Sequence, residues 1–187
     1  RSAVPVSGVN AVGGLVGVTS AVISNSFATG DVTAAITLTS AFSPANYAVG
    51  GFAGAIITAP PPNPQTSVTF AFASGNVTVS SVGDFENNPR TIGIGGFAGV
   101  IESAVTESAC FSSGSVRAED VGILKTTATG QGSLIFGVGG LTGVNANQLS
   151  ACYSSSSVYA LFNGVVLGTT GSNVAAGVGG VTGVALA

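Results

Sequence analysis

The sequence predicts an all-β fold, a β-solenoid (β-helix) of four to five rungs, on three observations. A Gly-Gly-x-x-Gly pattern recurs along the chain, starting at Gly13, Gly50, Gly95, Gly139 and Gly179. A second phrase with an aromatic residue follows it in phase, and Val, Ile, Thr and Phe are frequent while helix-forming residues are scarce. Units of roughly 40 residues with two or three strands cannot bury an apolar face alone, so they stack into one continuous core.

The 187 residues are predicted to form one domain, residues 1–187, because the repeats run along the whole chain and the last one is half-length. Only 6% of the residues are charged and 45% are hydrophobic, which indicates a packed protein and not a disordered tail. The four basic residues are too scattered for a nucleic-acid footprint, and no run of about 20 apolar residues predicts a membrane span. The chain begins with Arg1 and contains no Met, which fits a processed, secreted polypeptide.

Each unit is expected to begin with the diglycine strand and to continue through a short apolar spacer to the aromatic phrase. Within residues 67–78, Val68, Phe70 and Phe72 alternate with small or polar residues, which predicts that these three side chains share one face of a strand. Whether the aromatic column points into the core or along an outer face stays open at this stage. The aromatic residues at the equivalent repeat position are Phe27, Phe72, Phe111 and Tyr153.

Two stretches are expected to leave the ladders as loops. Residues 59–65 contain four prolines, and proline has no backbone N–H to donate. Residues 83–90 form a polar turn cluster. Each unit therefore combines about one turn of a coil with an insertion of variable length.

The first unit, Val12 to Thr33, resembles the GLUG repeat, in which GGLVG is followed by an apolar spacer and the phrase NSYATG. Asn25 to Val32 fits this phrase in order, with Phe27 in place of the tyrosine. The fourth unit departs from the pattern at Ser156, where a glycine is expected, and the fifth stops after its diglycine half. The resemblance implies a secreted or cell-surface protein of adhesin type, in which such repeats form spacer regions and no catalytic domain.

The two cysteines are predicted to be neighbours in the stack. Cys110 and Cys152 each precede the aromatic residue of their unit, so they lie one rung apart. Stacked neighbours about 4.8 Å apart fall within the Cα separation of roughly 4.4–6.8 Å that a disulfide tolerates. The alternative is two buried thiols at a small-residue position, which Ser26 and Ala71 occupy in other units.

No catalytic, cofactor or metal site is predicted, and the chain is expected not to be an enzyme. Histidine is absent, which excludes His-based triads, and the repeat register aligns no two carboxylates in one column. Glu119 with Asp120, or Asp84 with Glu86, are the options for a surface calcium ion, although solvated loops are favoured. The Gly-x-Gly-x-x-x-Gly spacing that begins at Gly93 occurs three times, which indicates a repeat turn and not a nucleotide loop.

The sequence therefore predicts a structural or adhesive element of a cell surface, an extracellular filament or a matrix. The fifth unit ends in apolar residues without a polar cap, so head-to-tail assembly with other copies is expected, or the chain is a fragment of a longer one. The residues expected at the assembly ends are Val4, Val6, Val178, Val181, Val184 and Leu186. The alternative is a carbohydrate- or ice-binding module that uses a regular row of aromatic or Thr side chains.

Two smaller expectations complete the prediction. Asn76-Val77-Thr78 is the one Asn-x-Ser/Thr sequon, so Asn76 is the expected position of N-glycosylation if the chain is secreted by a eukaryote. The expected partners are other copies of the chain, other surface or matrix proteins, and possible glycan ligands. No nucleic acid is expected among them.

Overall fold

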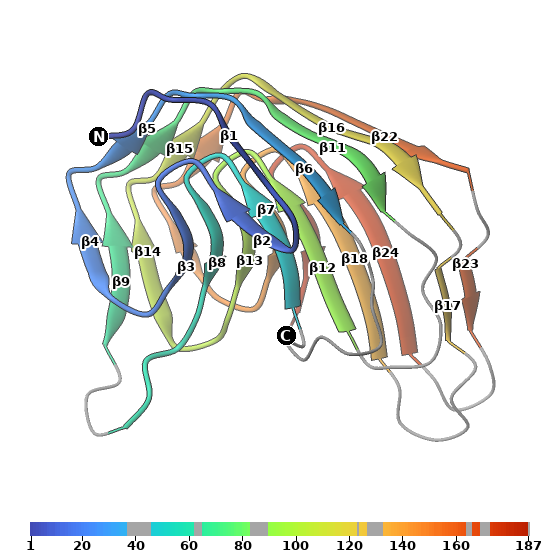
Figure 1. Ribbon diagram of the computed structural model, residues 1–187. Helices are drawn as coiled ribbons and strands as arrows, with labels where there is room; N and C mark the ends of the chain where they lie inside the picture. Colours follow the sequence, from blue (N-terminus) through green and yellow to red (C-terminus); the bar gives the residue numbers. More distant parts are fainter. Residues whose placement is uncertain are drawn as a thin grey trace.

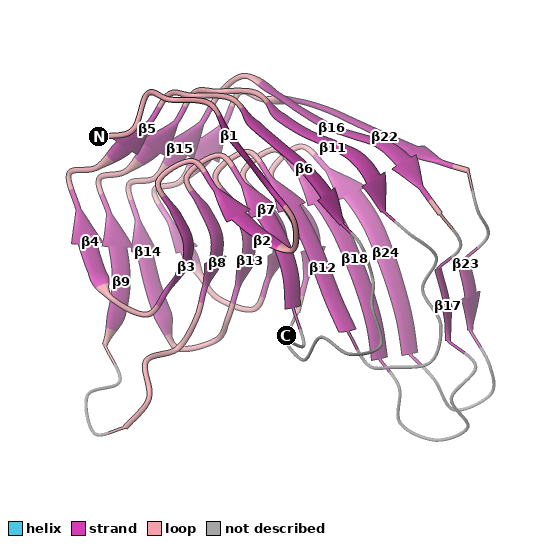
Figure 2. Ribbon diagram, in the orientation of Figure 1, coloured by secondary structure: helices cyan, strands magenta, loops and turns pink. Residues whose placement is uncertain are grey.

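The chain folds into a parallel β-solenoid, which confirms the predicted fold class (Figure 1). The computed structural model describes residues 1–36, 46–61, 65–82, 90–122, 124–126, 133–163, 166–168 and 173–186. These ranges contain strands and turns but no helix (Figure 2). The predicted loops at 59–65 and 83–90 lie partly outside them, since residues 62–64 and 83–89 are not described.

Five sheets run along the solenoid, numbered here in the order in which the chain visits them. Sheet 1 contains β2 (Ala11–Gly13), β7 (Asn46–Gly50), β12 (Arg90–Gly95), β18 (Ser133–Gly139) and β24 (Asn173–Gly179). Sheet 2 contains β3 (Val16–Thr19), β8 (Ala53–Ile56), β13 (Ala98–Ile101), β19 (Thr142–Asn145) and β25 (Thr182–Ala185). Sheet 3 contains β4 (Val22–Ser24), β9 (Thr66–Thr69), β14 (Val105–Ser108) and β20 (Leu149–Ser150).

The chain then crosses to the remaining sheets before it begins the next coil. Sheet 4 contains β5 (Phe27–Ala28), β10 (Phe72–Ala73), β15 (Phe111–Ser112) and β21 (Tyr153–Ser154). Sheet 5 contains β1 (Val6–Gly8), β6 (Val32–Ile36), β11 (Val77–Val82), β16 (Ser115–Val121) and β22 (Ser157–Phe162). A short additional pair joins β17 (Leu124–Thr126) and β23 (Val166–Gly168).

The strand pairs among the described residues are all parallel, and the repeat register places like residues on like. Val77 pairs with Val32 on one side and with Val116 on the other. Gly95 likewise pairs with Gly50 and with Gly139. Each residue of a repeat therefore becomes one member of a column along the solenoid, as the phase of the sequence predicts.

The coil is bent, and the described buried side chains form two larger cores and a smaller apolar cluster between sheets 1 and 2. Sheets 1 and 2 line the inner side of the bend in Figure 1, while sheets 3 and 5 lie on its outer sides. Sheets 1 and 5 enclose one core, in which Val49 and Ile94 pack against Val77 and Val116. Sheets 2, 3 and 4 enclose the other core, around the buried ring of Phe97.

The recurring glycines allow sheets 1 and 2 to meet at the bend. A Cβ at Gly96 would lie 2.1 Å from the carbonyl oxygen of Gly140 in the next coil. A Cβ at Gly99 would lie 2.4 Å from the backbone nitrogen of Val49. Both separations are shorter than real Cβ contacts, so the motif is a packing requirement of the corner. The Gly-x-Gly-x-x-x-Gly spacing belongs to this same corner and opens no helix in the part of the chain that the structure describes.

The prediction that Val68, Phe70 and Phe72 share one face is wrong. Val68 is buried in the second core, Phe70 is 64% exposed, and Phe72 is half-buried on the outer surface. The reason is that Phe70 has a φ of 53° and lies at the corner between β9 and β10. This left-handed residue interrupts the two-residue alternation of side chains. Even-numbered side chains therefore face the core in β9, and odd-numbered side chains face it in β10.

Candidate functional site

The aromatic column runs along the outer surface of sheet 4, which answers the question that the sequence leaves open. Phe27, Phe72 and Phe111 are half-buried, and Tyr153 is 58% exposed. Adjacent rings stack with centroids 4.9, 4.9 and 5.2 Å apart and interplanar angles of 3°, 9° and 4°. Because the rings stack face to face, each covers its neighbour and the column turns mainly ring edges toward solvent.

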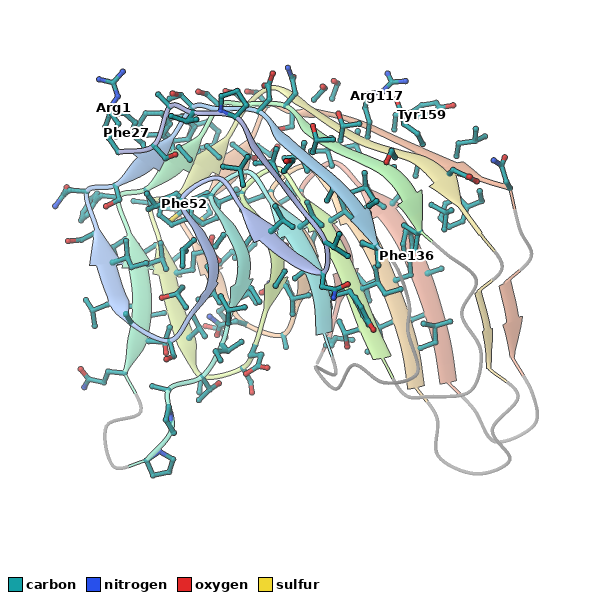
Figure 3. All side chains as sticks on the ribbon, viewed as in Figure 1. Arg1, Phe27, Phe52, Arg117, Phe136 and Tyr159 are labelled. Carbon is teal, nitrogen blue, oxygen red and sulfur yellow. The ribbon has the colours of Figure 1, made fainter. Side chains whose placement is uncertain are left out.

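The two ends of this column differ. The guanidinium of Arg1 lies over the ring of Phe27, 5.5 Å from its centroid (Figure 3). At the other end, Tyr153 stacks on Phe111 through one face. The aromatic column thus ends in a cation at the first coil and in an exposed ring at the last strand of sheet 4.

The turn between sheets 4 and 5 holds the predicted glycosylation residue. Asn76 is exposed, and its backbone N–H donates to Oδ1 of Asp31 at 2.8 Å. Its own Oδ1 accepts hydrogen bonds from the backbone N–H and the hydroxyl of Ser115, at 3.0 and 2.8 Å. These contacts form a polar ladder on the surface, and glycosylation of Asn76 stays a prediction.

The two cysteines lie one above the other at the corner between sheets 3 and 4. The residues before them, Ala109 and Ala151, have φ values of 53° and 52°, and this shared left-handed corner precedes both cysteines. Cys110 is buried and Cys152 is half-buried, and the backbone N–H of Cys110 donates to Sγ of Cys152 at 3.4 Å. Both cysteines carry free thiols in this structure, and the disulfide stays a prediction.

The sulfur atoms also contact main-chain carbonyl groups. Sγ of Cys110 lies 3.4 Å from the carbonyl oxygen of Ser108, and Sγ of Cys152 lies 3.2 Å from that of Ser150. A hydrogen bond with Cys110 is the largest cause that lowers the pKa of the Cys152 thiol, to about 6. The same hydrogen bond, followed by burial, raises the pKa of Cys110. Cys152 is therefore the sulfur that more readily becomes a thiolate.

A carboxylic acid lies beside these thiols inside the solenoid, and sequence reasoning missed it. Glu107 is 1% exposed, and neither of its carboxylate oxygens has a hydrogen-bond partner. Burial raises the pKa of Glu107 to about 8, and the nearby Cys152 adds to the effect. One carboxylate oxygen of Glu107 and the sulfur atoms of Cys110 and Cys152 all lie within 4.8 Å of one another.

The column of Glu107 is otherwise aliphatic. Glu107 pairs with Val68 in β9 and with Leu149 in β20, and Val68 pairs with Ile23 in β4. An alignment of the repeats that extended upstream of the cysteines would have placed this carboxylate among aliphatic residues. The sequence analysis compared carboxylates only with one another, so this replacement went unnoticed.

The other acidic residues singled out for calcium are engaged elsewhere or lie outside the described residues. Glu119 pairs with Arg117 at 3.2 Å on the surface, and Asp120 accepts a hydrogen bond from Asn163 at 2.8 Å. Asp84 and Glu86 belong to the stretch that the structure does not describe. The described surface therefore adds nothing in favour of a calcium site.

The predicted assembly ends carry apolar side chains at the two ends of the stack. Val178 pairs with Val138, which is fully buried, whereas Val178 itself is 49% exposed because β24 is the outermost strand of sheet 1 among the described residues. Val184 pairs with Val144 and is half-buried, as is Val6 at the other end. The remaining exposed members are Val4, Val181 and Leu186.

The fold and these columns define a parallel, in-register β-solenoid built from diglycine repeats. Residues 8–33 match the model of the GLUG motif, which confirms the resemblance found in the first unit. No curated protein matches the chain, and no solved structure matches it. Among the described residues, no helix is long and apolar enough to cross a membrane.

Proposed function

We propose that this protein is a non-enzymatic structural or adhesive β-solenoid of a cell surface, an extracellular filament or a matrix. The observation that carries the proposal is the parallel in-register stack itself, in which like residues form columns along the solenoid. A parallel ladder of this kind can be extended by a further strand in every sheet. The GLUG motif at residues 8–33 supports a role as a repeat spacer.

The two ends of the stack complement each other, which supports head-to-tail assembly. At one end, β24 and β25 extend sheets 1 and 2 by one strand beyond the last complete coil. At the other end, Ser2 forms a parallel bridge with Ala28 of sheet 4, and β1 extends sheet 5. A second copy placed end to end would add strands to sheets 4 and 5 beyond β21 and β22.

The aromatic column fits the same arrangement. Arg1 covers the ring of Phe27, and Tyr153 is exposed at the opposite end. When two copies stack in register, the Arg1 guanidinium of one copy faces the open ring of Tyr153 in the other. A cation between two aromatic faces is a favourable contact.

Binding of a glycan or of ice is less well supported by the surface. The stacked rings of sheet 4 present edges, whereas a sugar packs on an exposed ring face. The outward column of sheet 5 reads Thr33, Thr78, Arg117 and Tyr159, so it forms no regular row of Thr. Glycan binding is kept as the second candidate because Tyr153 does expose a ring at the end of the column.

The experiment is electron microscopy with sedimentation velocity on the purified chain at near-physiological salt. We expect rods much longer than one chain for the natural sequence. The double variant Val178→Lys with Val181→Lys places charges on the end, and it should yield single short rods. The matched control is Thr33→Lys with Thr106→Lys, which adds the same charge to exposed positions on the sides. Short rods for the natural sequence, or long rods for the end variant, would contradict head-to-tail assembly.

A further inference from the structure

Glu107 occupies a position where a carboxylic acid is costly. Its column contains Ile23, Val68 and Leu149, and its two oxygens are buried without a hydrogen-bond donor. Buried polar groups in proteins are nearly always paired, and an unpaired one requires an explanation. The two nearest candidates for an explanation are the sulfur atoms of Cys110 and Cys152.

A disulfide would not provide a hydrogen-bond partner for the carboxylate of Glu107. Oxidation would join the sulfur atoms of Cys110 and Cys152 and leave both oxygens of Glu107 without a partner. Protonation would neutralise Glu107, but the carbonyl oxygen of the carboxyl group would still lack a hydrogen-bond donor. A cation at the centre of the three groups would pair the carboxylate and both sulfurs together.

We propose that Glu107, Cys110 and Cys152 bind one divalent ion of the zinc class at the corner between sheets 3 and 4. Two thiolates and one carboxylate suit zinc, whereas calcium and magnesium take oxygen ligands only and copper(I) prefers soft ligands throughout. Ligands on one tetrahedral zinc ion at about 2.0–2.3 Å lie about 3.3–3.8 Å apart. The three ligand atoms lie within 4.8 Å of one another, so side-chain shifts of about 1 Å complete the site.

The surroundings of Cys152 provide access and a place for a fourth ligand. Cys152 is half-buried because β20 and β21, which flank it, are the last strands of sheets 3 and 4. The backbone N–H of Cys110 points at Sγ of Cys152, and such a donor stabilises a sulfur that carries negative charge. A water molecule on the open side of Cys152 would complete a tetrahedral ion. Binding releases to solvent the protons that the two thiols and the Glu107 carboxyl group carry.

The site would connect two successive coils. Glu107 and Cys110 belong to the coil of β14 and β15, and Cys152 belongs to the coil of β20 and β21. The ion would therefore fasten the last strands of sheets 3 and 4 to the body of the solenoid. All three protein ligands come from one chain, so the ion would act within that chain.

The test uses the full chain, reduced and stripped of metal with a chelator, and titrates it with Zn²⁺ and with Co²⁺. We expect one ion per chain, thiolate-to-cobalt charge-transfer absorption, and a rise in the melting temperature with Zn²⁺. Glu107→Gln and Cys152→Ser should each lose stoichiometric binding and the melting shift. Glu119→Gln is the matched control, since it removes an exposed carboxylate that pairs with Arg117.

Glu107→Leu is a second variant that distinguishes a loss of metal binding from a failure to fold. Leu149 already occupies this column, so the variant should fold at least as well as the natural chain when metal is absent, and it should show no response to Zn²⁺. The proposal is overturned if the reduced natural chain binds no Zn²⁺. It is equally overturned if Glu107→Leu and Cys152→Ser bind Zn²⁺ as the natural chain does, or if Co²⁺ shows no charge-transfer band.

Discussion

Two aromatic ladders run along this solenoid at the same spacing, one inside and one outside. The inner ladder stacks Phe52 on Phe97 with centroids 4.7 Å apart, and both rings are fully buried. The outer ladder stacks Phe27 on Phe72 at 4.9 Å, and both rings are half-buried. The ring contact is nearly the same, so the difference between the ladders is the burial. We therefore expect burial, and not ring stacking alone, to decide how much each column stabilises the fold.

The largest effect is expected from the inner ladder. Phe97→Ala removes a ring that packs inside the second core and leaves a cavity between two coils. We expect a loss of about 3–5 kcal/mol in the free energy of unfolding, as for other buried aromatic residues. Chemical denaturation followed by circular dichroism measures this loss. A loss below about 1 kcal/mol would mean that burial does not distinguish the two ladders.

A smaller effect is expected from the outer ladder. Phe72→Ala removes two ring contacts, to Phe27 and to Phe111, and each such contact contributes about 0.5–1.5 kcal/mol. We expect a loss of about 1–3 kcal/mol in the free energy of unfolding, which is less than for Phe97→Ala. Tyr153→Ala is the control, because Tyr153 has one ring neighbour in the column. It should cost about half as much in the same denaturation experiment, and equal losses would show that the rings do not act through stacking.

The same comparison shows what sequence reasoning reached and what it missed. The phase of the diglycine and aromatic phrases was sufficient to predict the stacking, because residues at one repeat position must share a column in any solenoid. The sequence did not show whether each column of side chains faces the core or the solvent, because this depends on the corner between sheets 3 and 4. That corner uses Asn25, Phe70, Ala109 and Ala151 at positive φ, and three of these four residues are of types, Phe and Ala, that do not favour the conformation.

The same corner is the reason why sequence reasoning did not place Glu107 beside the two cysteines. With strict alternation across it, Glu107 would have seemed unrelated to the cysteines that follow it. The left-handed residue Ala109 places Glu107 and Cys110 on the same, inward side of the chain. The bend between sheets 1 and 2 was also not predicted. The glycines indicate a turn, but they do not indicate that two sheets pack across it.

The smallest effect is expected at that corner, and it has the opposite sign. Phe70 has a φ of 53° and a side chain that is 64% exposed, so little side-chain packing offsets its unfavourable left-handed backbone conformation. Asn25 occupies the equivalent corner one coil earlier with a φ of 50°, and Asn tolerates this region better than Phe does. Phe70→Asn should therefore raise the free energy of unfolding by about 0.5–1 kcal/mol, measured by the same denaturation experiment. Phe70→Val is the counterpart, because a β-branched residue is disfavoured at positive φ and should lower stability. If the Asn and Val variants were equally stable, the corner would not be held in the left-handed region, and the reversal of side-chain direction between the two sheets would need another cause.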